Sequence, residues 1–213
     1  MKKLPLVIFI ALLALTVVAV PHQTIDRFSL SKGWNLVYGL NDPSQILGTS
    51  SSSNEGATAD ELRSSVELIY VYNPVVSEYV LLYAKEGTKQ TEEYKNFNPP
   101  QSIASTIPTS VMWVYSERTH SIKYEAPPYL NLSERDIIKG WNFVPVSFEM
   151  NGKSLNNLKG NCVFESVYTY AEEDGSTNWI NLASALDDTR MLGEGSASGL
   201  QLVIKVKDDC RMG

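Results

Sequence analysis

The chain has 213 residues, of which 43 % are hydrophobic and 20 % are charged, and its formal net charge is −6. This composition is typical of a folded globular protein and excludes a disordered chain. The acidic balance and the lack of a Lys/Arg cluster argue against nucleic acid and anionic membrane surfaces as partners, because both attract clustered positive charge.

The first residues have the pattern of an export signal. Lys2 and Lys3 precede an apolar run over residues 4–20, and Val17-Val18-Ala19 offers small residues for cleavage. We therefore predict a signal peptide over residues 1–19 and a secreted or cell-surface location. The apolar run is also near the lower limit for a membrane span, so the alternative is a retained N-terminal anchor, which would then be the membrane contact.

Strand patterns dominate the first half, which we assign to residues 20–128. Residues 24–30 alternate apolar with polar and predict an extended segment that pairs within its own half or adds to a neighbouring copy. Short helices are predicted over residues 44–47 and 58–65, and a Ser-rich loop over residues 48–56. Further strands are predicted over residues 34–40, 66–72, 79–83, 111–115 and 122–124. Pro127 and Pro128 mark the boundary with the second half.

The second half, residues 129–213, repeats this order with shorter connections. The sequence predicts a helical turn over residues 154–158 and a turn over residues 172–175. Pro145 predicts that its strand lies at a sheet edge, since proline cannot donate to an inner ladder. Strands are predicted over residues 141–144, 163–170, 179–182 and 200–206. The predicted fold class is all-β with a few short helices, in two tandem duplicated modules.

One six-residue motif occurs once in each half. Residues 32–37, Lys-Gly-Trp-Asn-Leu-Val, return at residues 139–144 as Lys-Gly-Trp-Asn-Phe-Val, which predicts a duplicated module. Gly33 is expected to supply a turn geometry that residues with a Cβ resist. Trp34 and Trp141 are in phase with apolar neighbours, so we interpret them as core residues rather than as sugar-stacking residues. The predicted anchors of the two repeats are Gly33, Trp34, Asn35, Gly140, Trp141 and Asn142.

The other aromatic residues of the strands stay open between core and surface. Tyr70, Tyr79, Tyr168 and Trp179 lie on predicted strands of antiparallel type, which commonly expose one face. The sequence does not decide which face each of them takes.

The order of these elements resembles a known repeat. The Gly-Trp-Asn motif, the short helix, the aromatic hairpin and the closing apolar strand are similar to the Gly-Trp-Asn β-repeat modules of prokaryotic, often archaeal, extracellular and surface-layer-type proteins. The resemblance covers residues 28–209 and is most specific at the two motifs. It implies a surface location and a structural or adhesive role, and it supplies no catalytic residues.

Two further features concern covalent modification. Cys162 and Cys210 are the two cysteines, and in an exported protein this pair favours a disulfide over a nucleophile or metal thiolates. Such a bond would join the last strand to the beginning of the strand at residue 163. Asn131-Leu132-Ser133 has the pattern of an N-glycosylation acceptor, so Asn131 is a candidate glycosylation site.

No catalytic, metal or cofactor site is predicted. His22 and His120 lie beside the signal and in a turn, without a Gly-x-Ser-x-Gly elbow. The acidic groups at residues 172–174, 187–188 and 208–209 lack the spacing of a calcium loop and are interpreted as solvated turns.

The sequence therefore predicts an extracellular structural or adhesive surface protein without catalytic activity. Its expected partner is a cell-surface protein, a glycan or a second copy of the chain. The alternative is a secreted carbohydrate-active protein, either glycan-binding or a glycan hydrolase that uses two carboxylates.

Overall fold

The computed structural model describes residues 23–37, 59–92, 110–126, 132–146, 150–173, 176–189 and 201–213. Antiparallel strands dominate these residues, and the α-helices among them are short, which confirms the all-β prediction. The predicted signal peptide, the helix at residues 44–47, the Ser-rich loop, the boundary at residues 127–129 and Asn131 lie outside the described residues.

The first half builds a four-stranded sheet with the order β2-β5-β3-β4. The strands are β2 (Gly33–Val37), β3 (Val66–Asn73), β4 (Glu78–Ala84) and β5 (Met112–Ser116), and helix α2 (Ala59–Ser65) precedes β3. A separate antiparallel pair joins β1 (Gln23–Leu30) to β6 (His120–Ala126). The N-terminal strand therefore pairs within its own half.

The second half builds a four-stranded sheet with the order β8-β11-β9-β10. The strands are β8 (Gly140–Pro145), β9 (Phe164–Glu173), β10 (Ser176–Asn181) and β11 (Gln201–Val206), and helix α5 (Leu155–Leu158) precedes β9. A 3-10 turn, η2 (Leu132–Glu134), leads to a short pair between β7 (Asp136–Ile137) and β12 (Cys210–Arg211).

Two details of the second half bear on the sequence predictions. Strand β8 lies at the edge of its sheet, as Pro145 predicts. The turn predicted over residues 172–175 is wrong at its beginning, because β9 continues through Glu173. Glu173 pairs with Ser176 in the ladder, so the hairpin closes over a shorter connection.

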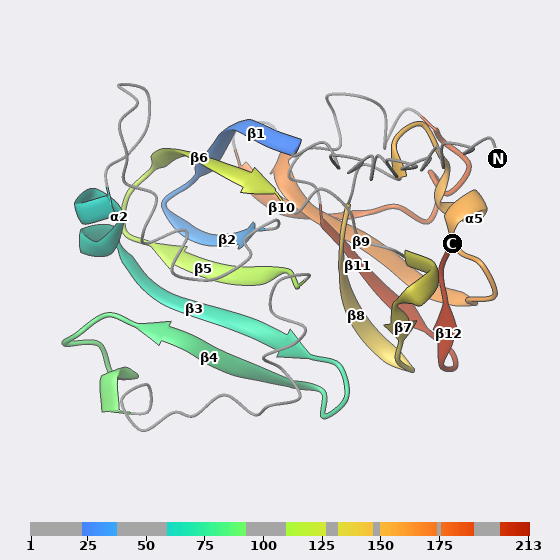
Figure 1. Cartoon of the computed structure of the whole chain (residues 1–213), viewed down its shortest axis with the longest axis horizontal. Coiled ribbons are helices and arrows are strands. Elements are labelled where there is room, and N and C mark those ends of the chain that lie inside the picture. The colour runs from blue at the N-terminus through green and yellow to red at the C-terminus, as the bar shows by residue number, and fades with distance from the viewer. Residues whose placement is uncertain are drawn as a thin grey trace, which may run out of the picture.

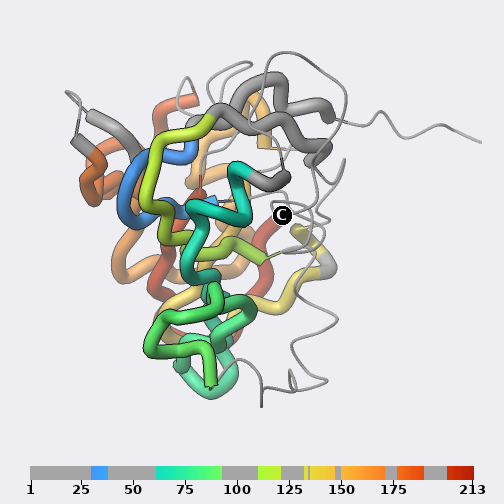
Figure 2. Tube along the Cα trace, turned by 90° about the vertical axis from the view of Figure 1, so that its left-hand side faces the viewer, coloured from blue at the N-terminus to red at the C-terminus, as the bar shows by residue number. Residues whose placement is uncertain are grey.

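The two sheets have the same strand order. In each sheet the Gly-Trp-Asn strand lies at one edge, the strand of that sheet that comes last in the chain lies beside it, and a hairpin completes the sheet. A helix precedes the hairpin in both halves, and an outer strand pair joins the segments that flank the sheet. The sheets lie beside each other along the long axis of the molecule (Figure 1). Viewed from the side of the first half, the strands of the second half lie behind it (Figure 2).

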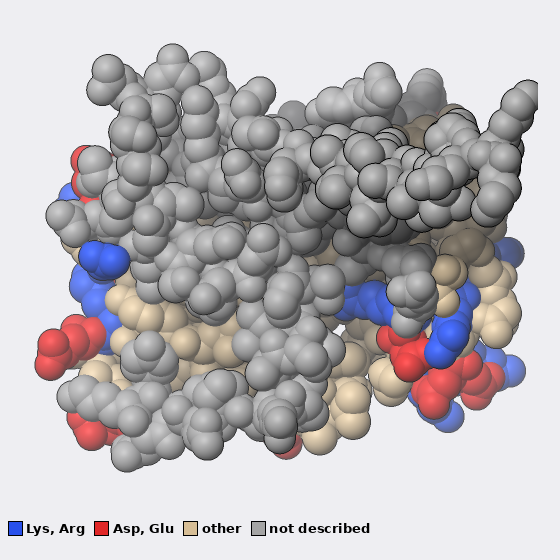
Figure 3. Space-filling view, viewed as in Figure 1, with Lys and Arg blue, Asp and Glu red and all other residues tan. Residues whose placement is uncertain are grey.

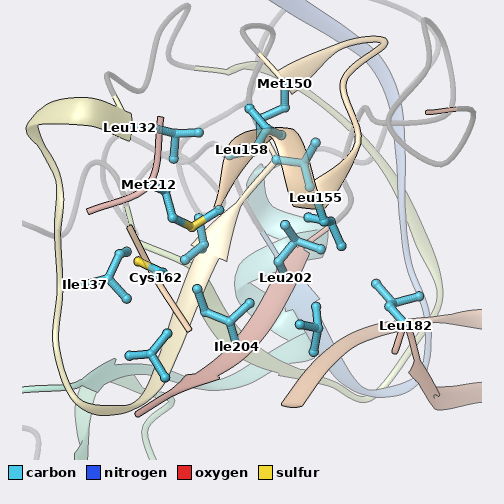
Figure 4. Close-up of a cluster of buried hydrophobic side chains, with 14 residues drawn as sticks. Leu132, Ile137, Met150, Leu155, Leu158, Cys162, Leu182, Leu202, Ile204 and Met212 are labelled. Atoms are coloured by element: carbon cyan, nitrogen blue, oxygen red, sulfur yellow. The ribbon is translucent and has the colours of Figure 1, made fainter. Parts of the chain in front are cut away.

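Each sheet buries one face in the core of its own half. On the first sheet this face consists of Val37, Ile69, Val71, Met112 and Val114, which are at most 1 % exposed and paired across neighbouring strands. The corresponding core of the second half is drawn in Figure 4. Its buried members are Leu132, Ile137, Val144, Val146, Met150, Leu155, Leu158, Cys162, Val167, Leu182, Leu202, Ile204, Val206 and Met212. Because side chains alternate along a strand, the residues between them point to the opposite face.

The predicted disulfide is present. Cys162 and Cys210 are bonded, and their Cα atoms are 5.1 Å apart, a separation ordinary for such a bond. Cys162 lies just before β9, and Cys210 begins β12. The bond therefore joins the β7–β12 pair to the segment that leads into the β9–β10 hairpin.

The asparagines of the two motifs make the same hydrogen bonds. Asn35 Oδ1 accepts from the N–H of Ser31 at 2.7 Å, and Asn35 Nδ2 donates to the carbonyls of Ser31 and Gly33 at 2.7 and 3.0 Å. Asn142 makes the corresponding bonds with Ile138, at 3.0 and 2.6 Å, and with the carbonyl of its repeat glycine at 3.1 Å. Both side chains are buried, at 6 and 3 % exposure. They satisfy backbone groups that would otherwise lack partners where the chain turns into the sheet.

The motif glycines turn the chain into the edge strands. Gly33 has a φ of 101° and Gly140 a φ of 98°, a region that residues with a Cβ rarely adopt, which confirms the expected turn geometry.

Gly140→Ala is expected to lower the free energy of unfolding by about 1–2 kcal/mol, because a positive φ strains alanine. No atom lies within 4 Å of the added Cβ, so the cost comes from the backbone alone. Urea denaturation of Gly140→Ala and of the matched Gly33→Ala measures it. Equal midpoints for both variants and the parent protein would contradict the expectation.

Candidate functional site

The tryptophans of the two motifs lie at the surface. Trp34 is 40 % exposed and Trp141 is 38 % exposed, so the prediction that they are core residues is wrong. Their apolar neighbours in phase, Leu36 and Phe143, are buried, but against the opposite sheet rather than in the core of their own half. The asparagine between each tryptophan and its apolar neighbour faces the interior instead.

The two sheets meet through the faces that carry these residues. Leu36 and Val111 of the first half pack with Phe143 and Val203 of the second half in one buried cluster. Ring contacts surround this cluster, and one of them joins Tyr72 to Phe143 with centroids 5.1 Å apart. The junction between the halves is therefore largely aromatic.

Trp113 of β5 contacts aromatic rings on both sides of the junction. It meets Trp34 edge-on, with a centroid distance of 6.3 Å and an interplanar angle of 89°. Across the junction it contacts Tyr170 at 5.0 Å and Trp179 at 5.8 Å, at 68° and 70°. Edge-to-face contacts are the favoured arrangement of aromatic rings, so the rings hold one another in fixed orientations.

Two adjoining pockets open along the junction, and we call them together the aromatic cleft. The first has a volume of about 500 Å³ and is lined by Trp34, Tyr70, Tyr79, Trp113, Tyr170 and Trp179. The second has a volume of about 580 Å³ and is lined by Tyr72, Tyr79, Trp141, Phe143, Tyr168, Trp179 and Val203. Tyr79 and Trp179 line both pockets. The chain has 4 tryptophans, and all of them lie in the cleft.

The described lining of the cleft carries no formal charge. Tyr79 and Trp179 are 52 and 49 % exposed. Partial burial raises the pKa of the Tyr79 hydroxyl, and a hydrogen bond with the Trp113 side chain opposes this shift. The phenol is therefore protonated at neutral pH. On the face drawn in Figure 3, most of the described acidic and basic side chains lie toward the two ends of the molecule.

The chemistry available in the cleft is stacking and neutral hydrogen bonding. Fixed indole and phenol rings present flat apolar faces, and the Trp N–H and Tyr O–H groups offer donors and acceptors. A hydrolase of the predicted alternative type requires two carboxylates that face one substrate. Among the described side chains that line the two pockets, none is acidic.

Two of the acidic candidates take part in local structure. Asp187 accepts a hydrogen bond from Asn156 Nδ2 at 2.7 Å, and Asp209 accepts one from the backbone N–H of Lys139 at 2.7 Å. Over the described ranges, no group of three or more His, Cys, Asp or Glu side chains is placed to hold a metal ion. Nor is any helix in those ranges long and apolar enough to cross a membrane.

His120 lies beside a serine but not in an open site. Its Nε2 is 2.6 Å from Ser65 Oγ, and this hydroxyl also donates to the carbonyl of Glu61 at 2.9 Å. Ser65 is fully buried. The pair therefore connects helix α2 to strand β6.

The sequence identifies the aromatic strand residues but does not predict that they come together between the two sheets. Tyr70, Tyr79, Tyr168 and Trp179 were recognisable as strand residues with one open face. The available signal was the alternation of aromatic residues on the same strands of both halves. The chain matches no protein-family model, no curated protein and no solved structure.

Proposed function

We propose that the chain is an exported, non-catalytic adhesive protein that binds a neutral glycan in the aromatic cleft. The observation that carries this proposal is the exposure of ordered indole and phenol rings in one place. Trp34, Tyr79, Trp141 and Trp179 all leave more than a third of their surface in water. Contiguous apolar surface of this kind commonly marks a binding site, because covering it is favourable.

The absence of charge in the described lining favours a neutral sugar. A pyranose ring has an apolar C–H face, which suits a fixed aromatic ring, and a rim of hydroxyl groups, which suits Tyr O–H and Trp N–H groups. A mostly apolar pocket with a few polar groups is the usual form of a small-ligand site. A sulfated or uronic-acid glycan would lack the basic partners that such ligands use.

The proposal also includes export of the chain and its origin as a duplicated module. The N-terminal signal pattern and the Cys162–Cys210 bond support an oxidising, extracytoplasmic location. The shared strand order and the matching Gly-Trp-Asn geometry support a duplicated module of the surface-layer type. Self-assembly and membrane attachment through residues 1–19 stay predictions.

A glycan array probed with the purified exported protein tests this function. Neutral oligosaccharides should retain the protein, and Trp34→Ala should weaken retention about tenfold, because loss of one stacking ring costs about 1.4 kcal/mol. The control is Val163→Ala, which truncates an exposed apolar side chain outside the cleft and should leave retention unchanged. Retention of acidic glycans alone, or full retention by Trp34→Ala, would contradict the proposal.

A further inference from the structure

The two pockets of the aromatic cleft occupy equivalent places in the two sheets. In the first sheet Tyr70 lies opposite Trp113 across the β3–β5 pair, and in the second sheet Tyr168 lies opposite Val203 across the β9–β11 pair. The strands that carry these pairs hold the same positions in the order of each sheet. Tyr70 therefore corresponds to Tyr168, and Trp113 to Val203.

The hairpins extend this correspondence across the junction. Tyr72 lies opposite Tyr79 on β4, and Tyr170 lies opposite Trp179 on β10. Tyr79 therefore corresponds to Trp179, and each of them lines both pockets.

Exchanging the two halves converts the lining of one pocket into that of the other. The first pocket is formed by Trp34 of the edge strand and by other side chains of the first sheet. Tyr170 and Trp179 of the second sheet close it. The second pocket is formed by Trp141 of the edge strand and by other side chains of the second sheet. Tyr72 and Tyr79 of the first sheet close it. The differences are an added Phe143 and the exchange of Trp113 for Val203.

We infer that the cleft holds two neighbouring units of one repeating neutral glycan, one unit in each pocket. This inference rests on the proposed function. Pockets with corresponding linings select the same chemical unit, and pockets that share Tyr79 and Trp179 as walls adjoin each other. A polymer that presents the same unit at successive positions satisfies both conditions, and joining two units makes the second contact intramolecular.

The two pockets are unequal in aromatic surface. Trp113 gives the first pocket a half-buried indole where the second has the smaller Val203. The second pocket adds Phe143, but this ring is only 9 % exposed and offers less surface to a ligand. A single sugar unit therefore binds the first pocket more tightly, and the second pocket contributes once the ligand is long enough to reach it.

The four tryptophans provide separate reporters for this inference. In the 15N-labelled protein the indole N–H signals of Trp34 and Trp113 report the first pocket, Trp141 reports the second, and Trp179 reports both. The probes are cello-, manno- and chito-oligosaccharides of increasing length. Single units should shift Trp34, Trp113 and Trp179. Longer chains should also shift Trp141, with one ligand per protein and an affinity at least about tenfold higher.

Two variants distinguish the pockets. Trp141→Ala should reduce the affinity for long ligands to nearly that for single units, whereas Trp34→Ala should lower the affinity for both single units and long ligands. Trp141→Phe should retain part of the gain with length, which separates lost stacking from a general loss of structure. The melting temperature of each variant checks that it is folded.

The possible outcomes separate this inference from the function on which it rests. Binding without a gain from length, or with a Trp141 signal that never moves, overturns the two-unit inference alone. Two long ligands per protein at saturation also overturn it, because the pockets would then act independently. A series in which no probe shifts any indole signal overturns the proposed glycan function together with the inference.

Discussion

The double variant Cys162→Ala/Cys210→Ala is expected to lose about 4 kcal/mol of unfolding free energy relative to the oxidised protein. The bond joins residues separated by 48 positions, so it restricts the unfolded chain over a long loop. Cys162 also packs in the core of the second half, where its truncation removes buried contacts. Urea denaturation followed by circular dichroism measures the difference in unfolding free energy.

Reduction provides the control for the disulfide variant. Treating the parent protein with a reductant should shift its midpoint to nearly that of the double variant, while the same reductant should leave the variant unchanged. Titration of the untreated, denatured protein should find essentially no free thiol. A double variant with the midpoint of the oxidised protein would show that the bond adds no stability.

Asn142→Ala is expected to cost about 2–4 kcal/mol of unfolding free energy, because it leaves buried backbone groups without partners. The side chain accepts from the N–H of Ile138 and donates to two carbonyls, and it is 3 % exposed. Water cannot readily replace these bonds where the chain enters the edge strand. Equilibrium denaturation of the oxidised variant measures the cost.

The chain offers a matched variant and a control. Asn35→Ala removes the corresponding bonds in the first half and should cost a similar amount. Asn156→Ala removes an exposed hydrogen bond to Asp187 and should cost under about 1 kcal/mol. If Asn142→Ala is no more destabilising than Asn156→Ala, the motif asparagine has no special structural role.

Much of the fold follows from local patterns in the sequence. Alternation predicts the strands, and Pro145 places β8 at a sheet edge. The repeated Gly-Trp-Asn motif locates two turns whose φ angles agree within a few degrees. With two cysteines in the chain, one intramolecular pairing exists, and the structure contains it.

The aromatic cleft could not be predicted in the same way. Alternation separates Trp34 from Asn35 but does not say which side faces the core when both faces of a sheet are covered. Here one face packs within its own half and the other packs against the second sheet, as Leu36 and Phe143 show. That contact joins residues far apart in the chain, and no local pattern encodes it.

The position of the disulfide also determines how the second half responds to mechanical force. Tension applied to the chain beyond Cys210 passes through the sulfur bridge to Cys162 and bypasses the residues between them. A separation of 48 residues corresponds to roughly 160 Å of extended chain that tension cannot draw out while the bond is intact. The first half contains no cysteine, so under load it extends along its full contour.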